Sequence, residues 1–182
     1  MNKCIFLDRD GVLNQDHIDY TYRLDDFKIL DKVPEALQML KNAGYLLIII
    51  TNQSGIAKGM YTKEDVMNCY HYLQAQCGQV IDDQYFAPHH PDYDTASLSR
   101  KPGSLMLEKA IAKYKIDVTK SWMIGDSVRD MEAAHKVALR TVFIPAQSAR
   151  YDPNKDYTSY ADQLADNLYH AAVIILGLTE NS

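Results

Sequence analysis

The chain has 182 residues, of which 47% are hydrophobic and 24% are charged, and its formal net charge at pH 7 is -5. This length and hydrophobic content exclude a wholly disordered chain and predict a single domain over residues 1–182. The mild acidity gives no support for nucleic-acid binding, which requires clustered lysine and arginine.

The cysteines and the first residues bear on where the protein works. Cys4, Cys69 and Cys77 have no metal-binding spacing, and the N-terminus runs straight into an apolar strand without a signal-peptide pattern. No apolar run approaches the length of a membrane span. We therefore predict a cytoplasmic monomer that binds neither membranes nor nucleic acid.

Apolar strands alternate along the chain with amphipathic helical segments, which is typical of a parallel sheet covered by helices on both faces. The predicted strands are Lys3–Leu7, Tyr45–Ile50, Gln84–Ala87, Ser121–Ile124 and Thr141–Ile144. Apolar helical stripes cover residues 33–43, 66–77, 107–114, 131–138 and 168–176, and Thr62 with Asp65 forms a capping signal before the second.

This order predicts an α/β fold, a three-layer Rossmann-like sandwich with a mostly parallel sheet. The polar, turn-rich segments His89–Arg100 and Ala146–Tyr160 are predicted to be loops. No segment between the strands is long enough for a large lid domain. We therefore expect a capless active site or one covered by loops only.

Two aspartates end the first predicted strand. Side chains alternate in direction along a strand, so Asp8 and Asp10 leave the backbone on the same side. Two carboxylates held this close repel each other unless a cation lies between them, and the usual cation is Mg²⁺. For this pair alone, a solvent-exposed acidic turn is the alternative interpretation.

Further polar groups follow other predicted strands, at the edge where parallel sheets bind ligands. They are Thr51-Asn52-Gln53-Ser54-Gly55, Arg100-Lys101-Pro102 and the run from Gly125 to Asp130. Each group has an alternative interpretation when it is taken alone. Thr51 would simply end a strand, Arg100 and Lys101 would be a solvated pair in a loop, and Gly125-Asp126 would be a turn that caps the next helix. Together they supply the nucleophile, metal ligands, cations and hydrogen-bond donors that phosphoryl transfer needs.

In such a site one aspartate can act as the nucleophile and form an aspartyl-phosphate. The aspartate two positions later can protonate the departing alkoxide and then deprotonate the attacking water. Asp126 would complete the magnesium site, Thr51 would bind the phosphate, and Lys101 would offset the negative charge of both phosphate and nucleophile.

These four motifs, beginning with Asp8-Arg9-Asp10-Gly11-Val12, resemble those of the haloacid dehalogenase-like phosphatases over about residues 1–145. Within that family the chain is similar to the D-glycero-D-manno-heptose 1,7-bisphosphate phosphatases and the related histidinol-phosphatases. The runs Thr51–Ala57 and Pro88–Pro91 are more specific to that subgroup than the paired aspartates are.

The resemblance implies a role for individual residues. Asp8 would be the nucleophile and Asp10 the general acid and base, with Mg²⁺ held by the Asp8 carboxylate, the Asp10 main-chain carbonyl and Asp126. Phosphate and substrate would be bound by Thr51, Asn52, Gln53, Ser54, Arg100 and Lys101, by Asp16 and Asp19 of the loop after the first strand, and by Ser127.

The chain departs from the subgroup at two places. The subgroup's structural zinc is held by Cys-x-His and Cys-x-Cys, but the matching residues here are Ala87-Pro88-His89 and Ser97-Leu98-Ser99. Alanine and serine cannot replace thiolates, so we expect no zinc, and the loop before Arg100 would shape the pocket without it. Ser127 stands where sugar bisphosphatases often have lysine, which would weaken the hold on a phosphorylated substrate.

The sequence therefore predicts a magnesium-dependent phosphatase that acts on a small phosphorylated metabolite through an aspartyl-phosphate. The expected substrate is D-glycero-D-manno-heptose 1,7-bisphosphate, which would lose its 7-phosphate. Histidinol phosphate or another phosphomonoester is the alternative, because the catalytic motifs do not distinguish leaving groups. A non-catalytic binding domain is disfavoured, because the costly buried charges of the site are all present.

Overall fold

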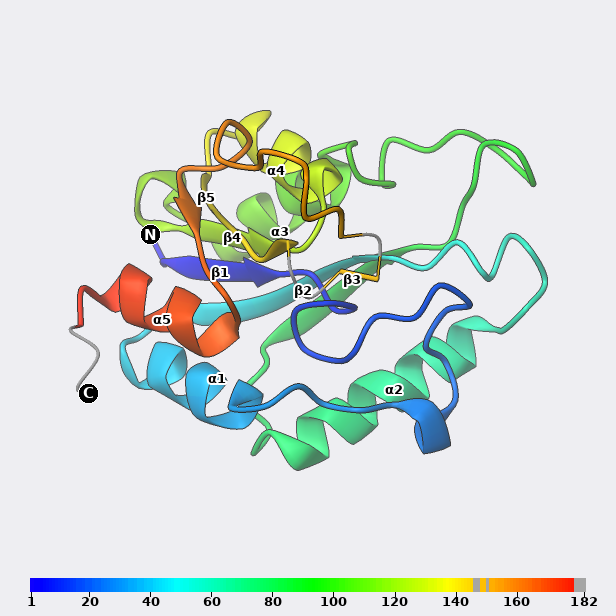
Figure 1. Cartoon of the computed structure of the whole chain (residues 1–182), viewed down its shortest axis with the longest axis horizontal. Helices are drawn as coiled ribbons and strands as arrows, with labels where there is room; N and C mark the ends of the chain where they lie inside the picture. The colour runs from blue at the N-terminus through cyan, green and yellow to red at the C-terminus, as the bar shows by residue number, and fades with distance from the viewer. Residues whose placement is uncertain (146–147, 150, 179–182) are drawn as a thin grey trace.

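The predicted strands pair in parallel throughout. A computed structural model describes residues 1–145, 148–149 and 151–178 of the chain. In sheet order the strands are β3 (Asp83–Ala87), β2 (Leu46–Asn52), β1 (Cys4–Leu7), β4 (Trp122–Gly125), β5 (Arg140–Phe143) and β6 (Gln163–Leu164) (Figure 1). The described residues also form α1 (Val33–Asn42), α2 (Lys63–Gln76), α3 (Leu105–Tyr114), α4 (Val128–His135), α5 (Leu168–Leu176) and the 3₁₀ turns η1 (Leu24–Asp26) and η2 (Val118–Lys120).

The central strand sends its side chains into two separate cores. Ile5 and Leu7 of β1 pack in one cluster with residues of α1, α2 and α5, whereas Cys4 and Phe6 pack in another with residues of α3 and α4. Helices thus cover both faces of the sheet, as Figure 1 shows. The predicted three-layer Rossmann-like sandwich is confirmed.

Local sequence explains how two of these elements form. β2 is buried from Leu47 to Thr51, as expected for a strand that is packed on both faces. α2 begins with a capping box, in which the Thr62 hydroxyl accepts from the Asp65 N–H at 3.2 Å and the Asp65 carboxylate accepts from the Thr62 N–H at 2.8 Å. The predicted capping signal is therefore confirmed.

Some element boundaries differ from the prediction. β2 continues to Asn52, so Thr51 and Asn52 lie within the strand and not after it. α4 ends at His135, before the predicted Ala138, whose φ of 56° is incompatible with a continuing helix. The edge strand β6 was missed, because its two exposed residues carry no apolar alternation.

Both predicted loops lack helices and strands where the structure describes them. This holds for all of 89–100 and for residues 148–149 and 151–160 of the second loop, whereas 146, 147 and 150 lie outside the described residues. The segment from 8 to 32, between β1 and α1, contains η1 as its regular element. Among the described residues, therefore, loops and the first turn of α4 border the carboxyl edge of the sheet, as expected for a minimal cap.

The sheet order fixes where a ligand site can lie. β1 pairs with β2 on one side and with β4 on the other, and the chain then leads outward in opposite directions to β3 and β5. In open parallel sheets, ligands bind outside the carboxyl ends of the two strands at such a switch point. β1 ends at Leu7 and β4 at Gly125, so the residues that follow them meet there.

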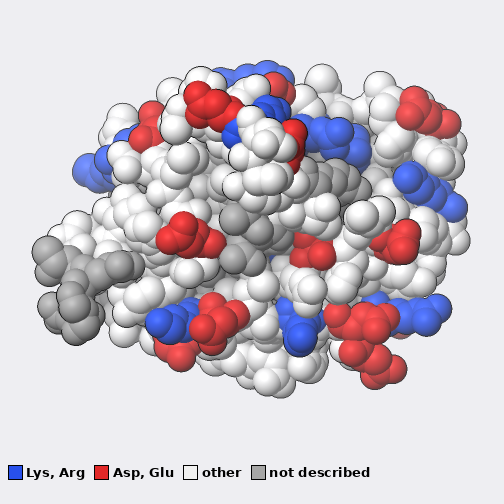
Figure 2. Space-filling model, viewed as in Figure 1, with Lys and Arg blue, Asp and Glu red and all other residues white. Residues whose placement is uncertain are grey.

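Within the described part of the chain, no helix has both the length and the apolar character that a membrane crossing requires. Acidic and basic side chains are interspersed over the face that Figure 2 shows. Cys4, Cys69 and Cys77 are buried free thiols.

Candidate active site

Three buried carboxylates meet where β1 and β4 end. Asp8 follows β1, Asp126 follows β4, and Asp130 lies in the first turn of α4. One oxygen of each lies within 4.8 Å of the other two, and all three residues line a cavity of about 290 Å³. Their exposed fractions are only 9%, 7% and 0%. Carboxylates this close and this buried repel one another, so the cluster needs cations.

Lys101 supplies one positive charge. Its Nζ lies 2.9 Å from Asp8 Oδ1 and 2.5 Å from Asp130 Oδ1, and it donates to the carbonyl of Ile50 at 2.7 Å. Burial lowers the pKa of Lys101, but the charges of Asp130 and Asp8 outweigh this and raise it above its ordinary value. The ammonium therefore stays charged, and it neutralises one of the three carboxylates.

The negative charge that Lys101 does not neutralise favours a bound metal ion. Burial and the charge of Asp130 raise the pKa of Asp8 to about 7 despite Lys101. Burial and the charge of Asp8 likewise raise the pKa of Asp126 well above its ordinary value. Carboxylate oxygens are the ligands that Mg²⁺ prefers, and a divalent ion would remove this repulsion. The donor set fits Mg²⁺, with Asp130 as a third carboxylate whose role the sequence had not defined.

Two glycines allow the loops to approach each other this closely. Gly11 has a φ of +79°, and a Cβ at this position would overlap the Asp126 carboxylate. A Cβ at Gly125 would overlap the side chain of Asp130. The two glycines of the predicted motifs thus serve packing around the carboxylates.

Ser127 orients Asp130 by beginning α4. Its hydroxyl accepts from the Arg129 N–H at 3.3 Å, and Asp130 Oδ2 accepts from the Ser127 N–H at 3.1 Å. This capping box directs the other Asp130 oxygen toward Lys101. Ser127 also lines the cavity, but its hydroxyl is engaged in the cap.

Asp10 belongs to a separate hydrogen-bond network beside the cavity. Its Oδ1 accepts from Arg9 Nη2 at 2.8 Å and from Asn14 Nδ2 at 2.9 Å, and its Oδ2 accepts from Gln53 Nε2 at 3.0 Å. Asp10 lines the cavity without joining the cluster of three carboxylates. Its carboxylate is thus held in one orientation, as a general acid and base requires.

Side chains from the end of β2 orient other members of the site. Gln53 Nε2 also donates to Thr51 Oγ1 at 3.0 Å, which connects the threonine to Asp10. Asn52 lines the cavity and exchanges two hydrogen bonds with the main chain of Lys101, at 3.0 Å and 2.9 Å. Asn52 therefore fixes the position of the lysine whose ammonium meets Asp8.

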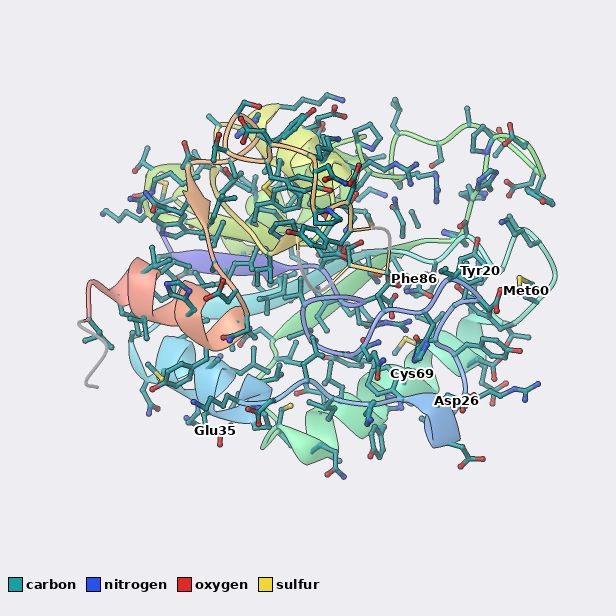
Figure 3. All side chains as sticks on the ribbon, in the orientation of Figure 1. Tyr20, Asp26, Glu35, Met60, Cys69 and Phe86 are labelled. Atoms are coloured by element: carbon teal, nitrogen blue, oxygen red, sulfur yellow. The ribbon has the colours of Figure 1, made fainter. Side chains whose placement is uncertain are left out.

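The loop after β1 borders the site on another side. Asp16 lines both the carboxylate cavity and a second cavity of about 700 Å³, whereas Asp19 lines only the second. The hydroxyls of Tyr20 and Ser54 are 3.3 Å apart, which joins this loop to the residues after β2. In Figure 3, Tyr20 points toward the loop that carries Met60.

The loop over residues 89–100 does not line the carboxylate cavity, although we expected it to shape the pocket. His89 Nδ1 pairs within this loop with Asp94 at 2.6 Å. Arg100 lies at its end, half-buried, and its Nη1 atom has no hydrogen-bond partner within the described part of the chain. Absence of zinc from this loop stays a prediction.

Comparison with known proteins identifies the family. A family model described as HAD-hydrolase-like, where HAD stands for haloacid dehalogenase, matches residues 98–171. The D-glycero-beta-D-manno-heptose-1,7-bisphosphate 7-phosphatase of Yersinia pestis is 43% identical over 138 residues, which are 71% of this chain and 73% of that protein. The chain belongs to the haloacid dehalogenase-like phosphatases. The family predicted from the motifs is thus confirmed, and the protein is a phosphoric monoester hydrolase.

Two further relatives of this phosphatase cover almost its whole length. The enzyme of the same name from Pasteurella multocida is 38% identical over 175 residues, or 91% of this chain and 95% of that protein. The crystal structure of D,D-heptose 1.7-bisphosphate phosphatase from B. bronchiseptica, complexed with magnesium and phosphate, superposes with a TM-score of 0.84. The two sequences are 27% identical, and the superposition covers 96% of this chain and 98% of the B. bronchiseptica chain.

One side of the cavity in this phosphatase was missed from the sequence. It is lined by Arg129 of α4 and by Tyr151, Lys155 and Tyr157 of residues 151–157, here named the wall segment. The wall segment lies in a predicted loop, and irregular segments carry no periodicity that would direct them to the site. The available signal was its content of tyrosine and lysine in a segment that follows a strand end.

Proposed function

We propose that this phosphatase hydrolyses D-glycero-D-manno-heptose 1,7-bisphosphate and releases the 7-phosphate, with Mg²⁺ as its cofactor. The observation that carries the proposal is the buried cluster of Asp8, Lys101, Asp126 and Asp130 at the switch point of the sheet. The choice of substrate is supported by relatives of that name at 38–43% identity.

Asp8 is the nucleophile in this mechanism. Its Oδ1 accepts from the Arg9 N–H at 2.7 Å and contacts Lys101 Nζ at 2.9 Å, so Oδ2 is the oxygen available for attack. Oδ2 forms a bond to phosphorus while the bond from phosphorus to the sugar oxygen breaks. The product of this step is an aspartyl-phosphate, and the sugar leaves with its oxygen.

Asp10 moves the protons of both steps. Its protonated carboxyl gives a proton to the departing sugar oxygen, and the resulting carboxylate then removes a proton from water. That water attacks phosphorus, so the bond to Asp8 breaks and inorganic phosphate leaves. The contacts from Arg9, Asn14 and Gln53 hold the Asp10 carboxylate in place through both transfers.

The carboxylates of Asp8, Asp126 and Asp130, with the main-chain carbonyl of Asp10, are the groups that would hold Mg²⁺. When bound, the ion offsets the charge of the phosphate and of the nucleophile as they approach each other. Lys101 contributes to the same neutralisation through its contact with Asp8, and Asn52 keeps the main chain of Lys101 in place.

We also propose that the protein acts as a monomer in the cytoplasm and binds no zinc. Three buried free thiols support a reducing compartment. Serine at 97 and 99, with alanine at 87, supports a loop without zinc. Size-exclusion chromatography and elemental analysis of the purified protein test the oligomeric state and the metal content.

Phosphate release with Mg²⁺ and with EDTA tests the activity. The substrates are heptose 1,7-bisphosphate, histidinol phosphate and p-nitrophenyl phosphate. We expect Mg²⁺-dependent release with the highest kcat/KM for the bisphosphate. Release from the other esters only would retain the chemistry and reject the substrate, whereas release from none of them would reject a phosphatase activity altogether.

A further inference from the structure

The carboxylate cavity has a second, positively charged side. Besides Lys101, the cations that line it are Arg129 and Lys155. Lys101 forms ion pairs with Asp8 and Asp130. Among the described residues, neither Arg129 nor Lys155 makes a side-chain hydrogen bond or ion pair. Two unpaired cations therefore face the same space as the carboxylates.

Lys155 is held in place by aromatic rings. Its Nζ lies 5.5 Å from the ring centre of Tyr157 and 4.9 Å from that of Tyr160. Tyr157 in turn packs edge-on against Phe143 of β5 at 5.1 Å, and Phe143 is only 1% exposed. The lysine thus rests on a platform that the core supports.

Tyr151 completes this aromatic surface. Its ring stacks on Tyr157 at a centroid distance of 5.8 Å and an angle of 25°, and 42% of the residue stays exposed. Tyrosine rings beside a cation provide both a flat surface for a sugar ring and hydroxyl groups for its oxygens.

Arg129 adds a second cation near the wall segment. Burial and the charge of Arg129 together lower the pKa of Arg100, so the two guanidinium groups are close enough to repel each other. Arg100 has no hydrogen-bond partner on Nη1, and no described carboxylate pairs with either arginine. Aspartates also line this cavity, but none of the described ones pairs with Arg129 or Lys155, so these two cations are available to an anionic ligand.

We propose that Lys155 and Arg129 form a second anion subsite, which binds the substrate phosphate that is not hydrolysed. Tyr151 and Tyr157 flank the sugar between the two phosphates. This subsite would supply the positive charge that a lysine at position 127 provides in related enzymes. Ser127 is neutral, and its hydroxyl caps α4. The inference rests on the proposed function, since it requires a substrate with two anionic groups.

Kinetics with two matched substrates test the subsite. Heptose 1,7-bisphosphate carries the second phosphate, and heptose 7-phosphate lacks it. We expect Lys155→Gln and Arg129→Gln each to lower the ratio of kcat/KM for the bisphosphate to that for the monophosphate about tenfold, mainly through KM. Lys155→Arg should largely retain the ratio, because it keeps the charge.

Lys109→Gln is the matched control, because Lys109 is exposed on α3 and away from the cavity. It should leave the ratio of the two substrates unchanged. An unchanged ratio in both glutamine variants would overturn the subsite while leaving the phosphatase activity intact. If the wild-type protein hydrolysed neither heptose phosphate, the proposed function itself would fail.

Discussion

The carboxylate cluster and the wall segment line the same cavity but are built in opposite ways. Asp8, Asp126, Asp130 and Lys101 are buried and contact one another directly. The wall segment is mostly exposed, and among the described residues the Lys155 ammonium contacts aromatic rings without an ion pair. A buried charge cannot change without leaving its partner uncompensated, whereas an exposed one can. In the proposed function, the cluster therefore supplies the chemistry, whereas the wall segment can vary with the substrate.

Removal of the nucleophile is the strongest test of this difference. Asp8→Asn should lower kcat by at least about a thousandfold, because an amide cannot form the aspartyl-phosphate. The fold should remain, since asparagine has the same shape and removes one of three repelling charges. Phosphate release and a thermal melt of the Mg²⁺-free protein measure the two effects.

Asp31→Asn is the control for the loss of one negative charge, because Asp31 is exposed and outside the cavity. Its turnover should match that of the wild type. Substantial turnover by Asp8→Asn would contradict the assignment of the nucleophile. A collapse of its thermal stability would show instead that Asp8 is needed to hold Lys101.

The pH dependence of stability should also come from the cluster. The pKa of Asp8 is raised from 3.8 to about 7 in the folded protein, so folding favours its protonated form. That contribution is complete below about pH 4 and is lost as the pH rises through 7. The Mg²⁺-free protein should therefore lose several degrees of Tm between about pH 5 and pH 8.

Scanning fluorimetry at constant ionic strength, with EDTA or with Mg²⁺, measures this decline. Mg²⁺ should reduce it, because the ion binds the deprotonated carboxylates. The same scan of Asp8→Asn isolates the contribution of this aspartate from those of other titrating groups. Equal pH dependence of wild type and variant in EDTA would exclude Asp8 as the cause.

The elements and site residues that could be predicted from the sequence all depend on short motifs with local physical causes. The run of apolar residues before Asp8 and the capping signal at Thr62 both act within a few positions. The parallel sheet then brings separate motifs together, since ligand groups gather at the carboxyl ends of its strands. This is why Asp8, Lys101 and Asp126 could be placed in one site in advance.

What could not be predicted depends on packing between distant segments. The engagement of Asn52 with the main chain of Lys101 joins residues 49 positions apart. The wall segment reaches the cavity because Tyr157 packs on Phe143, a contact for which an irregular loop has no pattern. The loop before Arg100 was predicted to shape the pocket, yet it does not line the carboxylate cavity.

Truncation of the two tyrosines should have the smallest effect and should show how far the wall segment depends on the core. Tyr157 packs against the cluster around Phe143, so Tyr157→Ala should cost about 1–2 kcal/mol of unfolding free energy. Tyr151 is exposed and contacts mainly Tyr157, so Tyr151→Ala should cost less than about 0.5 kcal/mol.

Urea unfolding of both variants, together with their KM and kcat, distinguishes a loss of folding stability from a loss of substrate contact. If the wall segment serves the substrate alone, Tyr151→Ala raises KM for the heptose bisphosphate and leaves kcat nearly unchanged, because the reacting groups are not touched. A loss in kcat that matches the loss seen in kcat/KM would mean that Tyr151 acts in the transition state. The cluster and the wall segment would then be one catalytic unit, and the difference between them would lie in burial alone.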